Sequence, residues 1–225
     1  MKQVLMLLTF AFGFQLNAQT HHIGLNFGVN QLLSIDEGPP FGDNSPWEST
    51  LGIGYELSYH YVFRNGLSVG LDIGYISPNF KDYEGSTFIE QLNEEVVADR
   101  VLILSYISYD ALVAYKWDLS SRYSIQVNTG PSIYYEDREK SYVEGFEETL
   151  IIRDFEYAEK RFNYGVSLGL KQSYTVYQDW NYRINLTATL RNSYIFDYLH
   201  RNNSIDRILP QAYLGVELEL GRRRP

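Results

Sequence analysis

The sequence predicts an all-β protein in which eight antiparallel strands run up and down around a closed transmembrane barrel with long outer loops. Apolar and polar residues alternate over long runs, most clearly in 162–176 and 180–194, and a period of two puts them on opposite strand faces. These runs exceed the usual strand of about 5–6 residues and suit the roughly 9–11 residues that cross a bilayer at a tilt. Long and short connections alternate along the chain, as they do in membrane barrels.

The two faces of each predicted strand differ in chemistry. In the run 162–176, Val166 and Leu168 share an apolar face, whereas Ser167 and Lys171 share a polar face. A face that carries charges cannot line the dry core of a soluble sheet. We therefore expect the apolar face to point outward to lipid and the polar face to point inward to a lumen.

Each element follows from this alternation and from the turn residues between the runs. The predicted strands are 22–33, 51–63, 67–76, a fourth strand that ends at 117 and could begin as early as 96, 123–135, 162–177, 180–194 and 208–221. Short turns near Asn65, Ser120 and Gln178 alternate with long connections. These long connections are 34–50, 77–100, 136–160 and 197–207, of which 150–157 could extend the sheet above the membrane. Pro131 donates no ladder bond, so we expect a local bulge at Gly130-Pro131.

The N-terminal segment has the pattern of a secretory signal peptide. Lys2 is its positive start, residues 4–14 are its apolar centre, and Leu16-Asn17-Ala18 is a cleavage site of small residues. We predict a signal peptide at 1–18 and one barrel domain at 19–225; a buried first helix is the alternative.

Composition excludes several classes of protein. The chain has no cysteine, so it can form neither a disulfide framework nor a thiolate metal site. Its net charge of −9 argues against nucleic-acid binding, which needs a basic face. Aromatic residues crowd the short turns, among them Tyr59, Tyr115, Trp117 and Trp180. This arrangement predicts an aromatic girdle at one membrane interface.

Two segments and the eight-strand plan carry a resemblance to a known family. Leu16-Asn17-Ala18-Gln19 and the run RYSIQVNTGPS at 122–132 resemble the PorT-type outer-membrane β-barrel family of Gram-negative bacteria. The resemblance implies the barrel fold, a place in the cell outer membrane and insertion by the barrel assembly machinery. It implies no catalytic residues. One departure is the C-terminal end, Leu220 to Pro225, where such barrels often carry an aromatic residue.

The histidines are the first candidates for metal binding or catalysis. His21 and His22 form a weak metal candidate, because a metal site needs three or four ligands. His60 points inward and suits hydrogen bonding in the lumen better than catalysis. Nucleotide-binding glycine motifs and zinc-protease motifs are absent from the sequence. We predict no catalytic residue, no cofactor and no bound metal.

The predicted site is a structural charge network on the inward face. Its members are Glu56, His60, Asp72, Asp110, Lys171, Arg183, Glu217 and Glu219. An eight-stranded barrel is only just wide enough for its interior side chains, so an acidic arc on the early strands should meet basic residues on the late strands. We expect Arg183 to be the bidentate partner in this ionic plug; Arg191 is also inward.

The outer loops concentrate negative charge. Segments 34–50, 77–100 and 136–161 each sum to −4. This charge either solvates the rim or binds a surface partner or divalent cations, whose ligands are oxygens.

These features predict a non-enzymatic outer-membrane protein with a structural or surface-interaction role, in contact with outer-membrane lipid. A barrel enzyme that modifies envelope lipid and a soluble lipocalin-like carrier are the alternatives.

Overall fold

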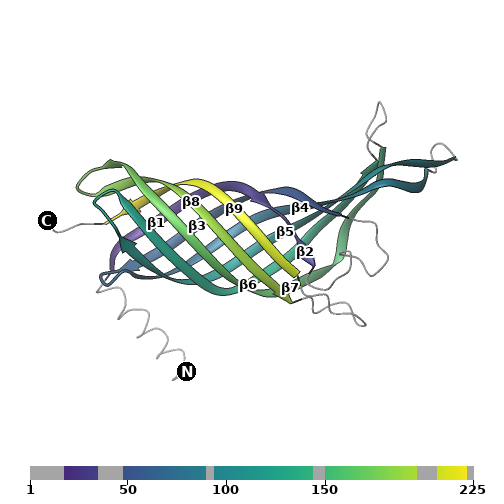
Figure 1. The fold of residues 1–225 in the computed structure, drawn as a ribbon. Coiled ribbons are helices and arrows are strands. Elements are labelled where there is room, and N and C mark those ends of the chain that lie inside the picture. Colours follow the sequence, from purple (N-terminus) through teal and green to yellow (C-terminus); the bar gives the residue numbers. More distant parts are fainter. Residues whose placement is uncertain (1–17, 35–47, 90–93, 144–149, 197–206, 222–225) are drawn as a thin grey trace, which may run out of the picture.

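The strands of the protein close into one barrel (Figure 1). The computed structural model describes residues 18–34, 48–89, 94–143, 150–196 and 207–221. These residues form β1 (Ala18–Asn30), β2 (Leu33–Ser34), β3 (Glu48–Phe63), β4 (Leu67–Ile89), β5 (Glu94–Asp118), β6 (Tyr123–Val143), β7 (Leu150–Gln178), β8 (Tyr182–Phe196) and β9 (Arg207–Leu220). None of the described segments is a helix that could cross a membrane. Two sets of predicted features lie outside the described residues. They are residues 1–17 of the predicted signal peptide and the centres of the predicted long connections, near Asp43, Glu90, Glu147 and Asn203.

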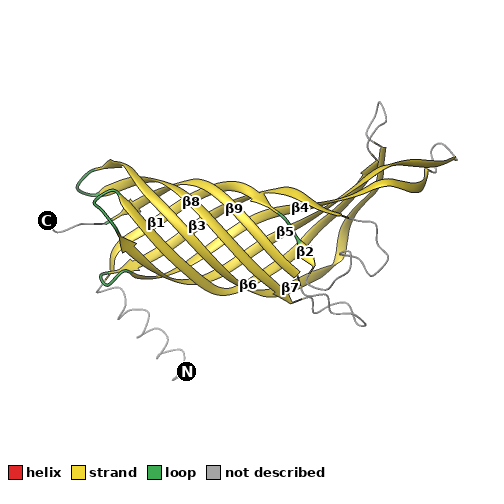
Figure 2. Cartoon of the chain, in the orientation of Figure 1, coloured by secondary structure: helices red, strands yellow, loops and turns green. Residues whose placement is uncertain are grey.

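Antiparallel pairing runs in a closed ring through β1, β3, β4, β5, β6, β7, β8 and β9, and β9 pairs back with β1. The two residues of β2 pair with β9 in the register that β1 has already set, Asn30 facing Gln211 and Leu33 facing Ile208. The described chain therefore forms eight long strands, and the predicted fold class is confirmed. Figure 2 shows strands joined by short loops at one end of the barrel.

Strands β4 and β6 are longer than predicted, whereas the predicted extension of the sheet at 150–157 is confirmed as the first part of β7. The predicted connection 77–100 is largely a hairpin, in which β4 and β5 pair as far as Ile89 and Glu94. The connection 136–160 is likewise paired, as far as Val143 on β6 and Leu150 on β7. In Figure 1 these strands reach beyond the rest of the barrel. Their polar residues indicated loops, but strands that project into water can carry polar residues on both faces.

Opposite charges face each other across the β4–β5 extension. Lys81 Nζ lies 3.1 Å from Asp99 Oδ2, and Arg100 pairs with Asp82. Such cross-strand pairs contribute up to about 1 kcal/mol each. They give the base of the β4–β5 extension side-chain contacts between its two strands.

The expected bulge at Gly130-Pro131 is wrong. Gly130 and Pro131 pair with Ser167 and Val166 on β7 without a register shift. On the β5 side the pairing stops at Ser132 and resumes at Thr129 in the same register. The missing N–H of Pro131 therefore interrupts the ladder without inserting a residue.

The short turns share one end of the barrel. Gly66, with φ of 85°, provides the left-handed residue between β3 and β4, and Asn65 Oδ1 accepts a hydrogen bond from Leu67 N at 3.1 Å. Ser120 Oγ accepts one from Tyr123 N at 3.0 Å. His21 of β1 pairs with Leu220 of β9 at this end. The first and last strands therefore close the barrel beside the turns, and this end is the turn end below.

The outer wall of the barrel is apolar, whereas most of the buried inward side chains are polar. Leu168, Leu190 and Leu214 expose 60%, 63% and 71% of their surface, whereas Ser167 and Ser193 expose none. This inverts the distribution in a soluble protein. It follows the predicted parity of the strands.

The aromatic girdle predicted at the short turns is present, and aromatic residues also gather near the other end of the apolar wall. Tyr177 and Tyr182 stack at the turn end, with ring centroids 5.5 Å apart. Tyr194 and Phe196 pack edge to face near the other end, at 5.0 Å. At about 3.3 Å per residue and a tilt near 40°, Tyr182 and Tyr194 are separated by roughly 30 Å of height. The band between them matches the thickness of a bilayer core.

The interior divides into two layers. Toward the turn end it holds the charged residues described below. Toward the far end it holds a buried apolar layer of Leu32, Ile76, Phe80, Leu102, Leu104, Tyr106, Tyr134, Ile195 and Leu209. Leu102 and Leu104, two inward leucines of β5, belong to this layer.

Candidate functional site

The centre of the lumen is a four-residue charge cluster around Arg191 on β8, called the Arg191 cluster below. Its guanidinium contacts the carboxylates of Glu56 on β3, Asp72 on β4 and Asp110 on β5. Nη2 lies 2.5 Å from Asp72 Oδ2, and Nη1 lies 3.3 Å from Asp110 Oδ2. One cation thus connects the β8 wall to the strands opposite.

The register between β4 and β5 places two acidic side chains next to each other, and the cation compensates their charge. Asp72 and Asp110 are direct cross-strand partners, and like charges in that position are destabilising. Ser132 Oγ donates a hydrogen bond to Asp110. The guanidinium of Arg191 contacts both carboxylates and so compensates this repulsion.

His60 extends the cluster toward the turn end. Its Nε2 is hydrogen bonded to Asp72 Oδ1 at 2.8 Å, and its Nδ1 lies 3.5 Å from Gln126 Nε2. A Cβ added to Gly70, the cross-strand partner of His60, would meet the imidazole ring at 2.6 Å. Gly70 therefore leaves the space that the His60 ring occupies.

A second cluster, called the Glu217 cluster, lies nearer the turn end. Lys171 Nζ donates to Glu217, and His22 Nδ1 lies 2.9 Å from the other oxygen of that carboxylate. The neighbouring Glu219 Oε2 lies 3.4 Å from Lys116 Nζ and 3.6 Å from His22 Nε2. Alternate residues of β9 thus hold carboxylates between basic side chains from β1, β5 and β7.

The structure places the predicted site residues in these two clusters, with one exchange of roles. Glu56, His60, Asp72 and Asp110 come together, as do Lys171, Glu217 and Glu219. Arg183 is opposite Glu219 in the ladder and does not reach the acidic arc; Arg191 takes that role.

Three members of the clusters were not among the predicted site residues. Arg191 was placed inward from its parity, and Lys116 lies between the outward Tyr115 and Trp117, so parity could have identified both. His22 was grouped with His21 as a metal candidate. The structure separates them: His22 is buried in the lumen, whereas His21 points outward and its Nδ1 lies 2.8 Å from Tyr59 Oη. Among the described residues no group of three histidines or acids could hold a metal ion.

One set of contacts has the order of groups found in hydrolases. Thr20 Oγ1 lies 3.0 Å from His22 Nε2, and His22 Nδ1 lies 2.9 Å from Glu217 Oε1. A nucleophile, a base and an orienting acid follow the same order. Here the three residues expose only 6%, 1% and 2% of their surface, and Lys171 also holds Glu217. The hydroxyl is packed inside the wall, so the geometry is that of a structural network.

A scan against protein-family models finds no match, and a search of characterised proteins finds none. Several solved structures have a similar arrangement. Neisserial surface protein A is 15% identical over 89% of this chain and 96% of its own, with a TM-score of 0.41. OprG, an outer membrane protein from Pseudomonas aeruginosa, is 12% identical over 91% and 97%, with a TM-score of 0.45. Ail, the attachment invasion locus protein of Yersinia pestis, is 11% identical over 90% and 99%, with a TM-score of 0.41.

Proposed function

We propose that this chain is an integral outer-membrane β-barrel with a structural or surface-interaction role and no catalytic activity. The observation that carries the proposal is the inverted wall, which is apolar outside and charged inside. Leucines that are more than half exposed cover the band between the aromatic girdles. Contiguous apolar patches on soluble monomers seldom exceed a few hundred Å², so a band that encircles the barrel suits hydrocarbon.

The same observation argues against a soluble lipocalin-like carrier. Such a barrel needs an apolar interior for its ligand and a polar outer wall. In this chain the interior around Arg191 and Glu217 is ionic, and the large apolar side chains lie outside.

Export and orientation complete the proposal. A signal peptide at 1–18 would deliver the chain to the periplasm, and the barrel assembly machinery would insert it. The short turns would face the periplasm, as in outer-membrane barrels. Membership of the PorT-type family belongs to this proposal and rests on the segments 16–19 and 122–132.

We further infer that the lumen is a structural plug and not a pore. The Arg191 cluster and the Glu217 cluster fill one part of it, and the apolar layer around Phe80 and Tyr134 fills the other. An ion path needs water, whereas the side chains of both clusters are buried and paired with one another.

A surface role would fall to the two long hairpins, β4–β5 and β6–β7, which project beyond the barrel. Their acidic segments suit solvation, and a partner or divalent cations in contact with this rim belong to the same proposal. Nucleic acid does not, because the net charge is −9.

The test is cell fractionation combined with gel mobility before and after heating. We expect the protein in the outer-membrane fraction, with a mobility that heating changes as the barrel unfolds. Recovery in the soluble fraction without detergent would contradict the proposal. Hydrolysis of envelope lipid by purified protein, lost in His60→Ala or His22→Ala, would instead support the barrel enzyme.

A further inference from the structure

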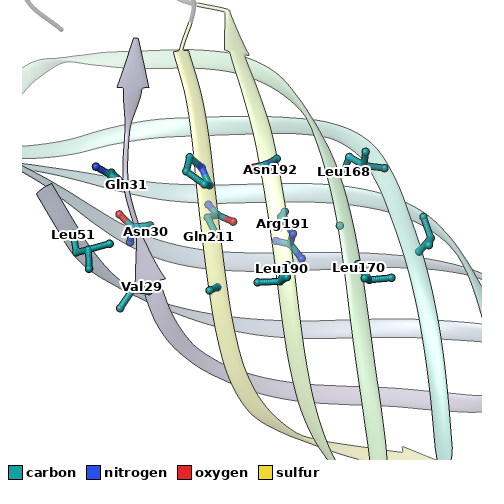
Figure 3. A pocket seen from close by; sticks show the side chains of 14 residues that line it. Val29, Asn30, Gln31, Leu51, Leu168, Leu170, Leu190, Arg191, Asn192 and Gln211 are labelled. Atoms are coloured by element: carbon teal, nitrogen blue, oxygen red, sulfur yellow. The ribbon is translucent and has the colours of Figure 1, made fainter. Parts of the chain in front are cut away.

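The outer wall carries a groove across β1, β9, β8 and β7. The part of the groove farther from the turn end is a hollow of about 570 Å³ (Figure 3). A second hollow of about 460 Å³ lies toward the turn end. The two share Val29, Leu170, Leu190 and Ala212 in their linings, so they form one continuous depression in the lipid-facing wall.

Small residues form the floor of this groove. Ala212 is the cross-strand partner of Leu190, and Ala188 is the partner of Leu214. Each alanine thus lies beside a leucine that stands well out from the wall, Leu190 and Leu214 being 63% and 71% exposed. The leucine side chains protrude from the wall and the alanine side chains do not. A flexible hydrocarbon chain could lie in the depression over the alanines.

The upper end of the groove carries a polar side chain. Figure 3 shows Asn192 on the same strand as Leu190 and nearer the far end of the barrel. Asn192 is exposed on the apolar wall, and its amide makes no hydrogen bond to any residue that the structure describes. Its cross-strand partners are Pro210 on β9 and Leu168 on β7, and neither has a polar side chain that could bond the amide. A primary amide in hydrocarbon is costly unless a hydrogen-bonding group is supplied.

The depth of Asn192 indicates which group could supply it. Asn192 precedes Tyr194, in the aromatic girdle opposite the turn end, by one outward position. The two residues therefore differ in height by about 5 Å. Asn192 thus lies just inside the hydrocarbon. This is the depth of the carbonyl group at the start of an outer-leaflet acyl chain. Below Asn192, the outward side chains that line the groove are apolar as far as Gln172, whose Oε1 already accepts a hydrogen bond from Tyr123 Oη at 3.1 Å.

We propose that this groove is a specific lipid site, which holds one acyl chain of an outer-leaflet lipid with its carbonyl hydrogen bonded to the Asn192 amide. The chain lies over Ala212 and Ala188. This inference rests on the proposed function, because it needs the wall to face a bilayer, and it goes further by assigning one lipid position and the group that orients it.

The test uses purified barrel in a mild detergent, titrated with a diester phosphatidylcholine or with its diether analogue, which lacks the carbonyl. Native mass spectrometry counts the lipids retained. We expect one retained diester lipid and at least a several-fold weaker retention of the diether. Asn192→Leu should remove this preference, and Ala212→Leu with Ala188→Leu should abolish retention by filling the floor. Ala111→Leu, at an exposed alanine on β5, is the matched control and should retain the lipid.

Equal retention by the wild type and the filled variant would overturn the lipid site, as would equal retention of diester and diether. A dimer that the filled variant abolishes would also overturn it, by showing a second copy in the groove. Heat-modifiable mobility, measured on every variant, reports separately whether the barrel is formed. A failed lipid site is thereby distinguished from a failed assignment to the membrane.

Discussion

The guanidinium of Arg191 on β8 and the carboxylate of Glu56 on β3 form a buried ion pair, although 135 residues separate them in the sequence. In the order of strands around the ring, β9 and β1 lie between their strands. The pair therefore contributes contacts across the lumen that no hydrogen bond of the ladder provides. Asp72 and Asp110 depend on the same guanidinium for compensation.

Arg191→Ala should lower the free energy of unfolding by about 3–5 kcal/mol, the usual result of leaving buried charges without their partner. Urea-induced unfolding in lipid vesicles measures this. Arg191→Lys keeps the charge but loses the planar fork that reaches several carboxylates, so it should recover only part of the loss. A wild-type stability in Arg191→Ala would mean that the carboxylates are solvated and that the cluster is not a plug.

Sequence parity could predict the faces of the strands but not which charges meet across the lumen. Arg183 and Arg191 share one strand and one parity, and both face inward. The stagger between β8 and the strands opposite decides which of them lies level with Glu56 and Asp72, and stagger is set by the whole ring. The outer ends of β4 and β6 were predicted as loops because their residues are polar. Polar residues argue against a strand only where the strand must bury an apolar face, and these ends project beyond the barrel.

Lys171 and Glu217 should be energetically coupled. Their ion pair is buried on adjacent faces of the lumen, with side chains exposed by 6% and 3%. Lys171→Met and Glu217→Gln should each destabilise the barrel, and the double variant should lose less than the sum by about 0.5–3 kcal/mol. Arg183→Ala combined with Glu217→Gln is the control, and we expect those two effects to be closer to additive. Strict additivity for Lys171 and Glu217 would contradict the contact.

The lipid-facing wall should tolerate small residues but not charges. Leu168 lies between the two girdles and is 60% exposed, so Leu168→Arg should cost about 2–4 kcal/mol in a bilayer. Leu168→Ala should cost much less, because it opens no cavity in a packed core. Ser167→Arg should also be damaging, since Ser167 is fully buried. Refolding into vesicles at increasing urea measures the free energy of unfolding of each variant. A wild-type value for Leu168→Arg would place this wall in water.

The purified protein should pass no large, steady current in planar bilayers. The charged clusters and the apolar layer around Phe80 and Tyr134 block the lumen at different heights. Arg191→Ala alone should therefore stay silent, because the apolar layer is intact. Conductance of the wild type would exclude the plug, and conductance of Arg191→Ala would show that the apolar layer does not seal.

Thiol labelling should resolve the orientation of the barrel, because the chain has no cysteine of its own. Ser120 is exposed in the short turn between β5 and β6, and Lys140 lies on β6 far beyond the girdle near Tyr135. With the turns in the periplasm, Lys140→Cys should react with a membrane-impermeant maleimide on intact cells. Ser120→Cys should react only after the outer membrane is permeabilised. Both positions are polar and outside the apolar band, so neither substitution should disturb the wall, and unchanged heat-modifiable mobility checks this. The opposite labelling pattern would invert the barrel and place the long hairpins in the periplasm, which would remove the basis for a role at the cell surface.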